Sequence, residues 1–363
     1  MVESAYIHIP FCRQKCNYCS FVSFPILHRK GQYLAALKKQ IAKEYRGESL
    51  KTLYLGGGTP SLLTLPELEP LLGLFNLAQG AEVTLEVNPE TVNAEYFQKL
   101  AGTCVNRLSI GSQSFDDRIL KSIGRKHKAE DVFRVVQEAR EVGIENISLD
   151  FIYGLPGQTM EGFIQDLKTA VGLGVEHISL YGLKIEDGSF YYRKPPQNLA
   201  DEELQAQMYL AAIETLEASG FEHYEISNFA RANRYSRHNV NYWENGEYYG
   251  FGLAAHGYVE GVRYSNTENF EDFCAGEAVQ IFSNKLSQQE RLEEEIFLGL
   301  RLMQGINVKN INEKFEIDFE KKYAKILEKY LADGFLVRQN GIYAFSKKGV
   351  LVSNCILADF IED

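Results

Sequence analysis

The sequence contains no apolar run near the roughly 20 residues that a helix needs to cross a bilayer. Its first residues, MVESA, lack the basic segment followed by an apolar segment that marks an export signal. Positive charge is in short supply, because 38 Lys and Arg face 49 Asp and Glu, for a formal net charge of −11. Surfaces that bind nucleic acid non-specifically are basic, so this balance argues against such a partner. We therefore expect a cytoplasmic, acidic, globular protein with no integral membrane segment and no nucleic-acid partner.

Cysteine is scarce too, with six among 363 residues. Three of the six are nevertheless crowded into eight positions, as Cys12, Cys16 and Cys19. Disulfide frameworks belong mainly to small exported chains, whereas clustered cysteines in a reducing compartment more often bind metal. The three thiols therefore predict a metal centre.

The number of thiols separates two kinds of centre. Iron–sulfur clusters are held by Cys thiolates, and a cubane normally takes four of them. Three thiolates leave one iron with an open position, which chemistry on a small molecule requires. Structural zinc usually takes paired Cys-x-x-Cys knuckles, and the sequence has no second knuckle. The spacing favours a cluster, while a zinc site with a distant fourth ligand, in a protein that only mediates interactions, stays open as an alternative.

Short β-branched runs alternate with helix-length amphipathic stretches along the first half of the chain. This alternation is typical of βα units that build a parallel sheet with right-handed crossovers. Six such units fit a partial (βα)6 barrel whose site lies at the carboxyl ends of the strands, and a flat doubly wound α/β sheet is the alternative. The predicted strands cover residues 5–9, 52–57, 82–87, 106–111, 146–154 and 177–183. The predicted helices among them cover residues 33–45, 95–100, 131–143 and 163–174.

The pattern changes twice in the second half. A long amphipathic helix is predicted at 201–220, and aromatic, turn-rich segments follow it. Helices at 287–303 and 319–334 and a hairpin with Asn340-Gly341 at its turn then predict a small winged-helix-like module. We therefore expect three parts: a barrel with the cluster loop at 1–220, an aromatic extension at 221–286 and the C-terminal module at 287–363.

Several linked motifs resemble one known family. The cysteine spacing resembles the signature of the radical S-adenosylmethionine (SAM) enzymes. The chain as a whole resembles the oxygen-independent coproporphyrinogen III oxidase family within that group, including the C-terminal module. The resemblance implies a partial six-stranded βα barrel, a 4Fe–4S cluster on the three cysteines and bound SAM. It rests on YIHIPFC before the cysteines, GGGTPS (56–61), LEVNPE (85–90), RLSIGSQSF (107–115) and DFIYGLPGQT (150–159).

The resemblance also implies which residues contact SAM. Without the resemblance, a helix cap or a surface hydrogen bond would explain each of these residues equally well. Gly57 and Gly58 leave room for a close approach of backbone groups to a ligand, and Thr59 offers a hydroxyl. The planar fork of Arg125 suits the methionine carboxylate. Tyr6, six residues before Cys12, matches the tyrosine of the family. The polar side chains near strand ends, suited to a ribose and an α-amino group, are Glu86, Gln113 and Asp150.

Two features depart from the oxidases and resemble the heme-chaperone branch of the family. The oxidases carry a further cysteine two positions beyond the third, where this sequence has Phe21. They also carry a substantial extension before the motif, where this sequence has eleven residues ahead of Cys12. Both departures argue against porphyrinogen oxidation.

The segment HNVNYW at 238–243 resembles the signature of the chaperone branch. It implies heme binding, with His238 as the candidate axial ligand and with Tyr242 and Trp243 packed on the porphyrin. His256, in GLAAHGY, is the rival ligand or a residue of the cofactor site. An exposed loop histidine beside a buried Trp is the structural alternative for HNVNYW.

The favoured function is therefore a heme chaperone on a radical SAM scaffold, with a 4Fe–4S cluster, SAM and heme as cofactors. Its partners would be heme and acceptor proteins that the sequence does not name. The alternative is an oxygen-independent coproporphyrinogen III oxidase, a radical SAM oxidative decarboxylase. Phe21 and HNVNYW favour the chaperone.

Overall fold

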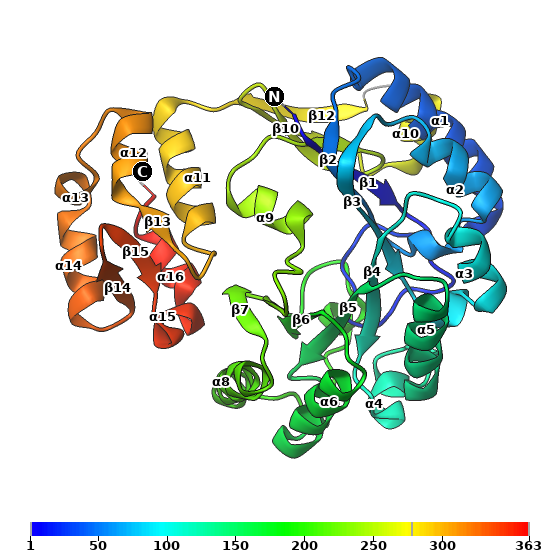
Figure 1. The fold of residues 1–363 in the computed structure, drawn as a ribbon, viewed down its shortest axis with the longest axis horizontal. Coiled ribbons are helices and arrows are strands. Elements are labelled where there is room, and N and C mark those ends of the chain that lie inside the picture. Colours follow the sequence, from blue (N-terminus) through cyan, green and yellow to red (C-terminus); the bar gives the residue numbers. More distant parts are fainter. Residues whose placement is uncertain (1, 277–278, 362–363) are drawn as a thin grey trace.

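The fold is built on one sheet of nine strands in a computed structural model that describes residues 2–276 and 279–361 (Figure 1). Six of the strands are parallel and lie side by side in chain order, so each βα unit adds one strand next to the last. The prediction of six parallel strands is confirmed. Their bounds are β1 Ser4–Ile9, β2 Leu50–Gly57, β3 Leu77–Val87, β4 Arg107–Gln113, β5 Asn146–Tyr153 and β6 His177–Gly182.

The helices that follow these strands cover the outer face of the sheet (Figure 1). Each presents an apolar stripe to it, as α5 does with Val132, Val135 and Val136. These stripes and the outward side chains of the strands form the main hydrophobic core. The helices are α1 Lys30–Glu44, α2 Leu65–Leu72, α3 Ala94–Leu100, α4 Asp117–Ser122, α5 Ala129–Glu141, α6 Met160–Gly172, α7 Phe190–Arg193 and α8 Glu202–Ala218, with short 3-10 turns at Leu27–Arg29, Pro60–Leu62 and Pro89–Thr91.

The sheet curves without closing, as expected for a partial barrel (Figure 1). The middle segment of the chain supplies both of its edges. At one edge β8 (Asn228–Ala230) pairs antiparallel with β6 and with β7 (Glu222–Glu225). At the other edge β9 (Tyr249–Phe251) pairs parallel with β1. Residues 222–251 of the segment expected as an extension thus contribute strands to the barrel sheet.

The segment HNVNYW forms a short helix, α9 (Arg237–Trp243), inside the curve of the sheet (Figure 1). A turn-rich region was expected here, but three acceptors start a helix. The Ser236 side chain accepts from the Asn239 N–H. The Glu82 carboxylate accepts the N–H groups of Arg237 and His238, at 3.1 Å each. The barrel therefore holds α9 through a buried carboxylate of β3.

The rest of the chain forms two smaller units beside the barrel (Figure 1). The first is an antiparallel sheet of β10 (His256–Val259), β11 (Val262–Asn266) and β12 (Gln280–Lys285), with α10 at Phe270–Ala275. The second is the C-terminal module, in which three short strands pack with helices. Its elements are α11 Gln288–Gly299, β13 Ile306–Asn307, α12 Val308–Phe315, α13 Phe319–Lys322, α14 Ala324–Ala332, β14 Leu336–Gln339, β15 Ile342–Phe345, α15 Lys347–Leu351 and α16 Ser353–Ala358.

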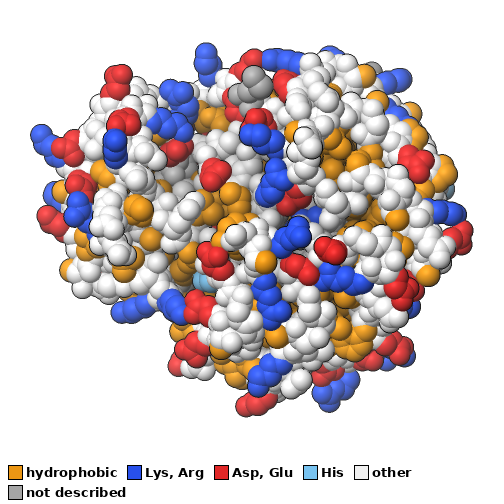
Figure 2. Space-filling view, in the orientation of Figure 1, with side chains coloured by type: hydrophobic (Ala, Val, Ile, Leu, Met, Phe, Trp, Pro, Cys, Tyr) orange, Lys and Arg blue, Asp and Glu red, His pale blue; other side chains and the backbone are white. Residues whose placement is uncertain are grey.

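The predicted hairpin of this module is confirmed, with Asn340 and Gly341 both at positive φ, +51° and +76°, as a type I′ turn requires. The single helix predicted at 319–334 is wrong, because α13 and α14 are separate helices that meet at Tyr323. On the face drawn in Figure 2, acidic and basic side chains are interspersed. Within the described ranges, no helix has the length and apolar character that spanning a bilayer would demand.

Removing the carboxylate of Glu82 is expected to destabilise the fold at α9. Glu82 is buried, and Glu82→Ala leaves two buried N–H groups without an acceptor, at about 1–3 kcal/mol each. Glu82→Gln keeps one acceptor oxygen and should cost less. Urea denaturation of both variants measures the difference, and equal losses would contradict the proposed anchor.

Candidate functional site

The three cysteines lie in the loop that leaves β1, at the carboxyl edge of the sheet. Other residues of the loop fasten it in place. The Cys12 N–H donates to the Phe24 carbonyl at 3.1 Å, and the Asn17 N–H donates to the Ile123 carbonyl at 3.0 Å. The Asn17 side chain also donates to the Ser122 carbonyl, at 3.0 Å. Backbone and Asn17 side-chain contacts therefore hold the shape of the loop.

All three thiols are half-buried, free of disulfides and exposed to one pocket. Burial raises the pKa of Cys19 to about 11 and also raises the pKa of Cys12, so both thiols stay neutral until a metal displaces the proton. Throughout the described chain, no three His, Cys, Asp or Glu side chains gather closely enough for a single metal ion. A cubane does not require this, because each thiolate binds a different iron. The loop fits a 4Fe–4S cluster.

The pocket beside the thiols has a volume of about 820 Å³. This lies in the upper part of the range of roughly 300–1,000 Å³ that is usual for ligand sites. The Thr59 hydroxyl reaches to 3.5 Å from the Cys12 sulfur. The structure brings these predicted SAM contacts together on the pocket wall: Gly57, Gly58, Thr59, Glu86, Gln113, Arg125 and Asp150.

Two carboxyl groups face the pocket, Glu86 from β3 and Asp150 from β5, the two strands on either side of β4. Glu86 accepts from the Tyr54 hydroxyl at 2.9 Å and from the Gly57 N–H at 3.0 Å. Burial raises the pKa of Glu86 to about 7, and the charge of Asp150 adds to the rise, against the two hydrogen bonds. Asp150 accepts from the hydroxyls of Ser109 and Ser148, and burial raises its pKa as well. Hydrogen bonds hold both carboxyl groups on the pocket wall, where each has the chemistry to accept from a ribose hydroxyl or an ammonium group.

Arg125 lies directly beside the thiols. Its guanidinium donates to the Gly111 carbonyl at 2.6 Å and to Asn88 Oδ1 at 3.1 Å. Its Nη1 lies 3.9 Å from the sulfur of Cys16. A guanidinium held next to the open iron of a cluster has the chemistry to pair with a carboxylate bound at that iron.

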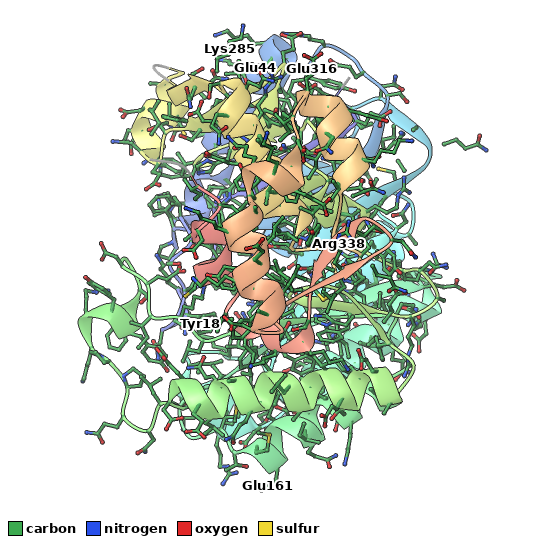
Figure 3. All side chains as sticks on the ribbon, turned by 90° about the vertical axis from the view of Figure 1, so that its left-hand side faces the viewer. Tyr18, Glu44, Glu161, Lys285, Glu316 and Arg338 are labelled. Atoms are coloured by element: carbon green, nitrogen blue, oxygen red, sulfur yellow. The ribbon has the colours of Figure 1, made fainter. Side chains whose placement is uncertain are left out.

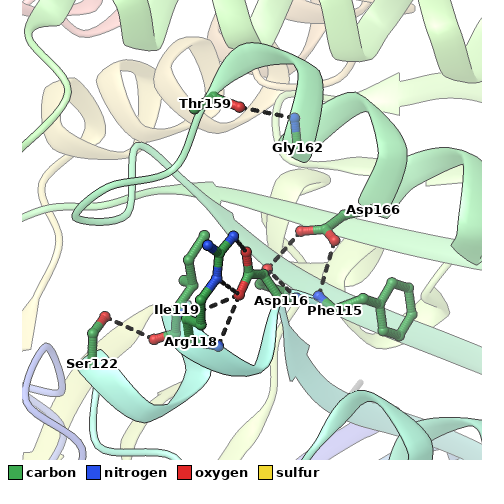
Figure 4. A network of polar contacts seen from close by, with 9 residues as sticks. Phe115, Asp116, Arg118, Ile119, Ser122, Thr159, Gly162 and Asp166 are labelled. Atoms are coloured by element: carbon green, nitrogen blue, oxygen red, sulfur yellow. Dashed lines mark hydrogen bonds and ion pairs between the residues drawn. The ribbon is translucent and has the colours of Figure 1, made fainter.

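Gln113 ends β4 with a φ of +66°, a conformation that non-glycine residues seldom adopt. The turn after it is held by Asp166, whose carboxylate accepts from the Ser114 hydroxyl at 2.6 Å and the Phe115 N–H at 3.0 Å (Figure 4). Asp116 then caps α4 by accepting from the Arg118 N–H at 2.8 Å (Figure 4). Strained backbone persists where its surroundings fix it, and it is common at functional sites. This network sets the Gln113 side chain on the pocket wall.

Tyr6 and the glycines have neighbours other than those expected. Tyr6 is not among the described residues of the pocket wall; its hydroxyl bonds to His8 Nδ1 at 3.1 Å and its ring stacks on Tyr54. A Cβ on Gly57 would lie 2.4 Å from the His8 ring, and one on Gly58 would lie 2.8 Å from the Ile9 carbonyl oxygen. The glycines therefore let β1 and the cluster loop pack closely, before any ligand is considered.

His238 is buried within the barrel and uses both ring nitrogens. Its Nδ1 lies 2.8 Å from the Thr52 hydroxyl, and its Nε2 lies 2.7 Å from the Tyr242 hydroxyl. Because Thr52 donates onward to Ser4, it accepts from Nδ1–H, which leaves Nε2 to accept from Tyr242. Burial lowers the pKa of His238 to about 3, so the imidazole is neutral. The nitrogen with a lone pair is already hydrogen-bonded.

The other predicted heme contacts also lie off the pocket wall. Of α9, Asn239 is the described residue that lines the pocket. Trp243 lies 5.3 Å from the Arg301 guanidinium, measured to the ring centroid, and its buried Nε1 has no described acceptor. His256 is exposed on β10, away from the pocket, so its expected place in the cofactor site is wrong.

Several residues on the pocket wall were not predicted. Asn88 holds Arg125, and Arg107 and Arg301 bring two further positive charges. The alternation of RLSIGSQ along β4 places residues 107, 109, 111 and 113 on one face, and this signal was sufficient to find Arg107. Arg301, like the wall residues Val350, Leu351, Ser353 and Asn354, comes from the C-terminal module, and no local pattern marks it.

Comparisons with known proteins agree with this geometry. Residues 6–170 match the profile of the Radical SAM superfamily, and residues 286–352 match that of the HemN C-terminal domain. The solved structure of the coproporphyrinogen III oxidase HemN from Escherichia coli superposes with a TM-score of 0.88, over 98% of this chain and 89% of that one. At 24% identity this likeness shows the fold. The open sheet, the three-cysteine loop and these matches define a protein of the radical SAM class, which implies a 4Fe–4S cluster and SAM.

Two full-length relatives give the family. The chain is 37% identical to the heme chaperone HemW of Bacillus subtilis, over 100% of both chains. It is 36% identical to the heme chaperone HemW of Lactococcus lactis, over 99% of this chain and 98% of that one. The chain belongs to the HemW family.

Replacing Cys12, Cys16 or Cys19 with Ala is expected to abolish a cluster that otherwise brings about four irons per chain after anaerobic reconstitution. Iron and sulfide analysis measures the loss. Cys104→Ala, an exposed cysteine outside the loop, is the matched control and should retain full iron content. Stoichiometric zinc without iron uptake would contradict the assignment.

SAM binding is expected to weaken as the pH falls below 7. The carboxylate of Glu86, which can accept from an ammonium or a ribose hydroxyl, predominates above its pKa of about 7 and is lost below it. Affinity, read from the SAM-dependent change in the electron paramagnetic resonance spectrum of the reduced cluster, should fall by up to about tenfold per pH unit. Glu86→Gln should bind more weakly with a flat profile. Parallel pH profiles in the two proteins would rule out this role.

Proposed function

We propose that the chain is a cytoplasmic heme chaperone, which binds heme and passes it to acceptor proteins on a scaffold that also holds a 4Fe–4S cluster and SAM. The names of its relatives support this, since they are heme chaperones. The observation that carries it is the reach of the pocket, which extends from the thiols across the barrel to Leu351 and Asn354 of the C-terminal module. That reach leaves room for a second ligand beyond SAM.

Apolar side chains along this pocket suit a porphyrin face. Phe21, Tyr181 and Leu351 line the pocket and keep 66%, 46% and 37% of their surface exposed. Exposed apolar groups that gather at one place mark binding sites, and aromatic rings pack well on a flat π-system. Phe21 stands where the oxidases of the resembling family have a further cysteine, so this position supplies a ring in place of a thiol.

HNVNYW remains the proposed source of the axial ligand. Neutral imidazole binds heme iron through a free lone pair, and here that lone pair, on Nε2, accepts from Tyr242. Ligation by His238 therefore requires the Tyr242 hydroxyl to give way. Tyr242 competes with iron for the same nitrogen, and this competition gives the test.

Tyr242→Phe and His238→Ala are expected to act in opposite directions on heme affinity. Tyr242→Phe removes the competing donor and keeps the ring, so heme should bind as tightly as to the wild type or more tightly. His238→Ala should weaken binding and shift the Soret band, while also costing about 1–3 kcal/mol of unfolding free energy through the unpaired Thr52 and Tyr242 hydroxyls. Heme titrations followed by absorption measure both. An unchanged Soret band in His238→Ala would remove His238 as the ligand and turn attention to His256.

The oxidase alternative is tested on the same protein. Reconstituted chain incubated with coproporphyrinogen III, SAM and a reductant is expected to form no protoporphyrinogen. Steady formation of that product would refute the chaperone assignment, whatever the heme titration shows.

A further inference from the structure

Arg107 is a buried cation that makes no hydrogen bond within the described chain. It is 2% exposed, and its Nε is fully buried with no hydrogen-bond acceptor. Among residues 2–276 and 279–361 the structure gives its guanidinium no hydrogen bond and no ion pair. The carboxyl groups of Glu86 and Asp150 attract its charge through space, but buried donors without an acceptor still cost about 1–3 kcal/mol each. Because Arg107 lines the pocket, its missing acceptor has a place from which to come.

The carboxylates near Arg107 are engaged elsewhere. Glu86 is bonded to Tyr54 and Gly57, and Asp150 to the hydroxyls of Ser109 and Ser148. Both carboxyl groups attract the charge of Arg107 through space, but neither accepts a hydrogen bond from it in the described chain. The guanidinium is left to face the pocket with its donors unused.

Arg301, which follows α11, brings a second guanidinium to the pocket wall. Its Nε is buried without an acceptor, and the hydrogen bond of its side chain within the described chain is a long one of 3.5 Å to Asn354 Oδ1. The buried carboxyl group of Glu225 attracts its charge through space. The rings of Trp243 and Phe297 lie 5.3 and 4.7 Å from it. Aromatic rings hold the position of a guanidinium while leaving its in-plane donors free. Arg301 is thus oriented, and its strong donors are unused.

These two arginines are separate from the group expected to take the carboxylate of SAM. Arg125 sits beside Cys16 at the cluster end of the sheet. Arg107 opens β4, and Gln113 closes it at the cluster end, six residues later. At about 3.3 Å per residue the two ends of β4 are about 20 Å apart. A methionine carboxylate would bind at the open iron, near the Gln113 end of β4. The backbone of Arg107 lies at the opposite end of that strand.

We propose that Arg107 and Arg301 form an anion-binding subsite that binds the propionate carboxylates of the tetrapyrrole. This inference rests on the proposed binding of heme and adds which end of the heme lies where. The guanidinium fork matches a carboxylate, and both arginines lie on the pocket wall away from the thiols. One propionate binds at Arg107, where β4 begins, and the other binds at Arg301 of the C-terminal module. The macrocycle packs toward Phe21, Tyr181 and Leu351. The subsite also gives the buried donors of Arg107 an acceptor.

The test compares heme with heme dimethyl ester, in which both propionates are esterified. Affinities for both are measured by absorption titration of the reconstituted full chain, the Arg107→Met variant and the Arg301→Gln variant. Each variant is expected to bind heme about tenfold or more weakly, the loss of a charge-assisted hydrogen bond, and to bind the ester as the wild type does. Arg338→Gln is the matched control, because Arg338 is paired with Glu320 on the outer side of the C-terminal module (Figure 3). It should bind both ligands normally.

Two further readouts separate binding from folding and from the cofactor. Arg107→Met breaks no hydrogen bond of the described chain, so the variant should keep a cooperative urea transition. Loss of that transition would show that Arg107 is needed for the fold and not for the ligand. The SAM-dependent change in the cluster spectrum should survive in both variants.

Three outcomes would overturn the subsite. They are equal losses for heme and its ester, unchanged heme affinity in both variants, and a loss of the SAM response without a loss of heme. A wild-type chain that binds neither heme nor ester would instead refute the proposed function itself.

Discussion

The structure depends on satisfying a polar inner face on a parallel sheet. Parallel sheets normally pack apolar residues on both faces, and buried polar groups are costly unless they are hydrogen-bonded. Here the inner face meets this condition pair by pair. His177 bonds to Ser148 and Tyr224, at 2.8 Å each, and His238 bonds to Thr52 and Tyr242. Burial lowers the pKa of both histidines far enough to keep the rings neutral. The barrel can stay open and hollow because most of the polar groups on its inner face find partners without a packed core, Arg107 and Arg301 being exceptions.

The elements of the fold were largely predictable, because periodicity reports burial on one face. All six parallel strands begin and end within a few residues of their predicted positions, except that β3 starts five residues earlier. The helix α2 was missed, because Pro66 and Pro70 break the pattern that would have revealed it. The helix α9 was missed because its start depends on Glu82, which is more than 150 residues away in the sequence. Local signals cannot show an anchor of that kind.

The residues of the site also divide into those that the sequence predicts and those that it does not. Residues at the carboxyl ends of parallel strands converge by the geometry of the sheet, so Glu86, Gln113 and Asp150 could be grouped from the sequence. Tyr6 was predicted from the same family resemblance, but its hydroxyl is hydrogen-bonded to His8, a side chain that packs against Gly57. Arg301 could not be grouped with the site, because the docking of the C-terminal module on the barrel brings it there. Motif and strand position thus locate the cofactor end of the pocket and Arg107, and tertiary packing alone reveals the contribution of the C-terminal module.

One line of contacts connects His238 with the cluster loop. The His238 ring stacks on Tyr54, with 5.2 Å between centroids. The Tyr54 hydroxyl in turn holds Glu86, which accepts the N–H of Gly57 beside the cluster loop. Freeing Nε2 of His238 for an iron means moving a ring that packs directly on Tyr54, and Tyr54 is one of two donors that fix Glu86. A ligand that shifts α9 therefore acts on the carboxyl group that faces SAM. By linkage, a ligand that fixes Glu86 acts equally on α9. The proposed heme ligand and the proposed SAM contact would therefore share one support, made of the ring stack of His238 on Tyr54 and the hydrogen bond of Tyr54 to Glu86.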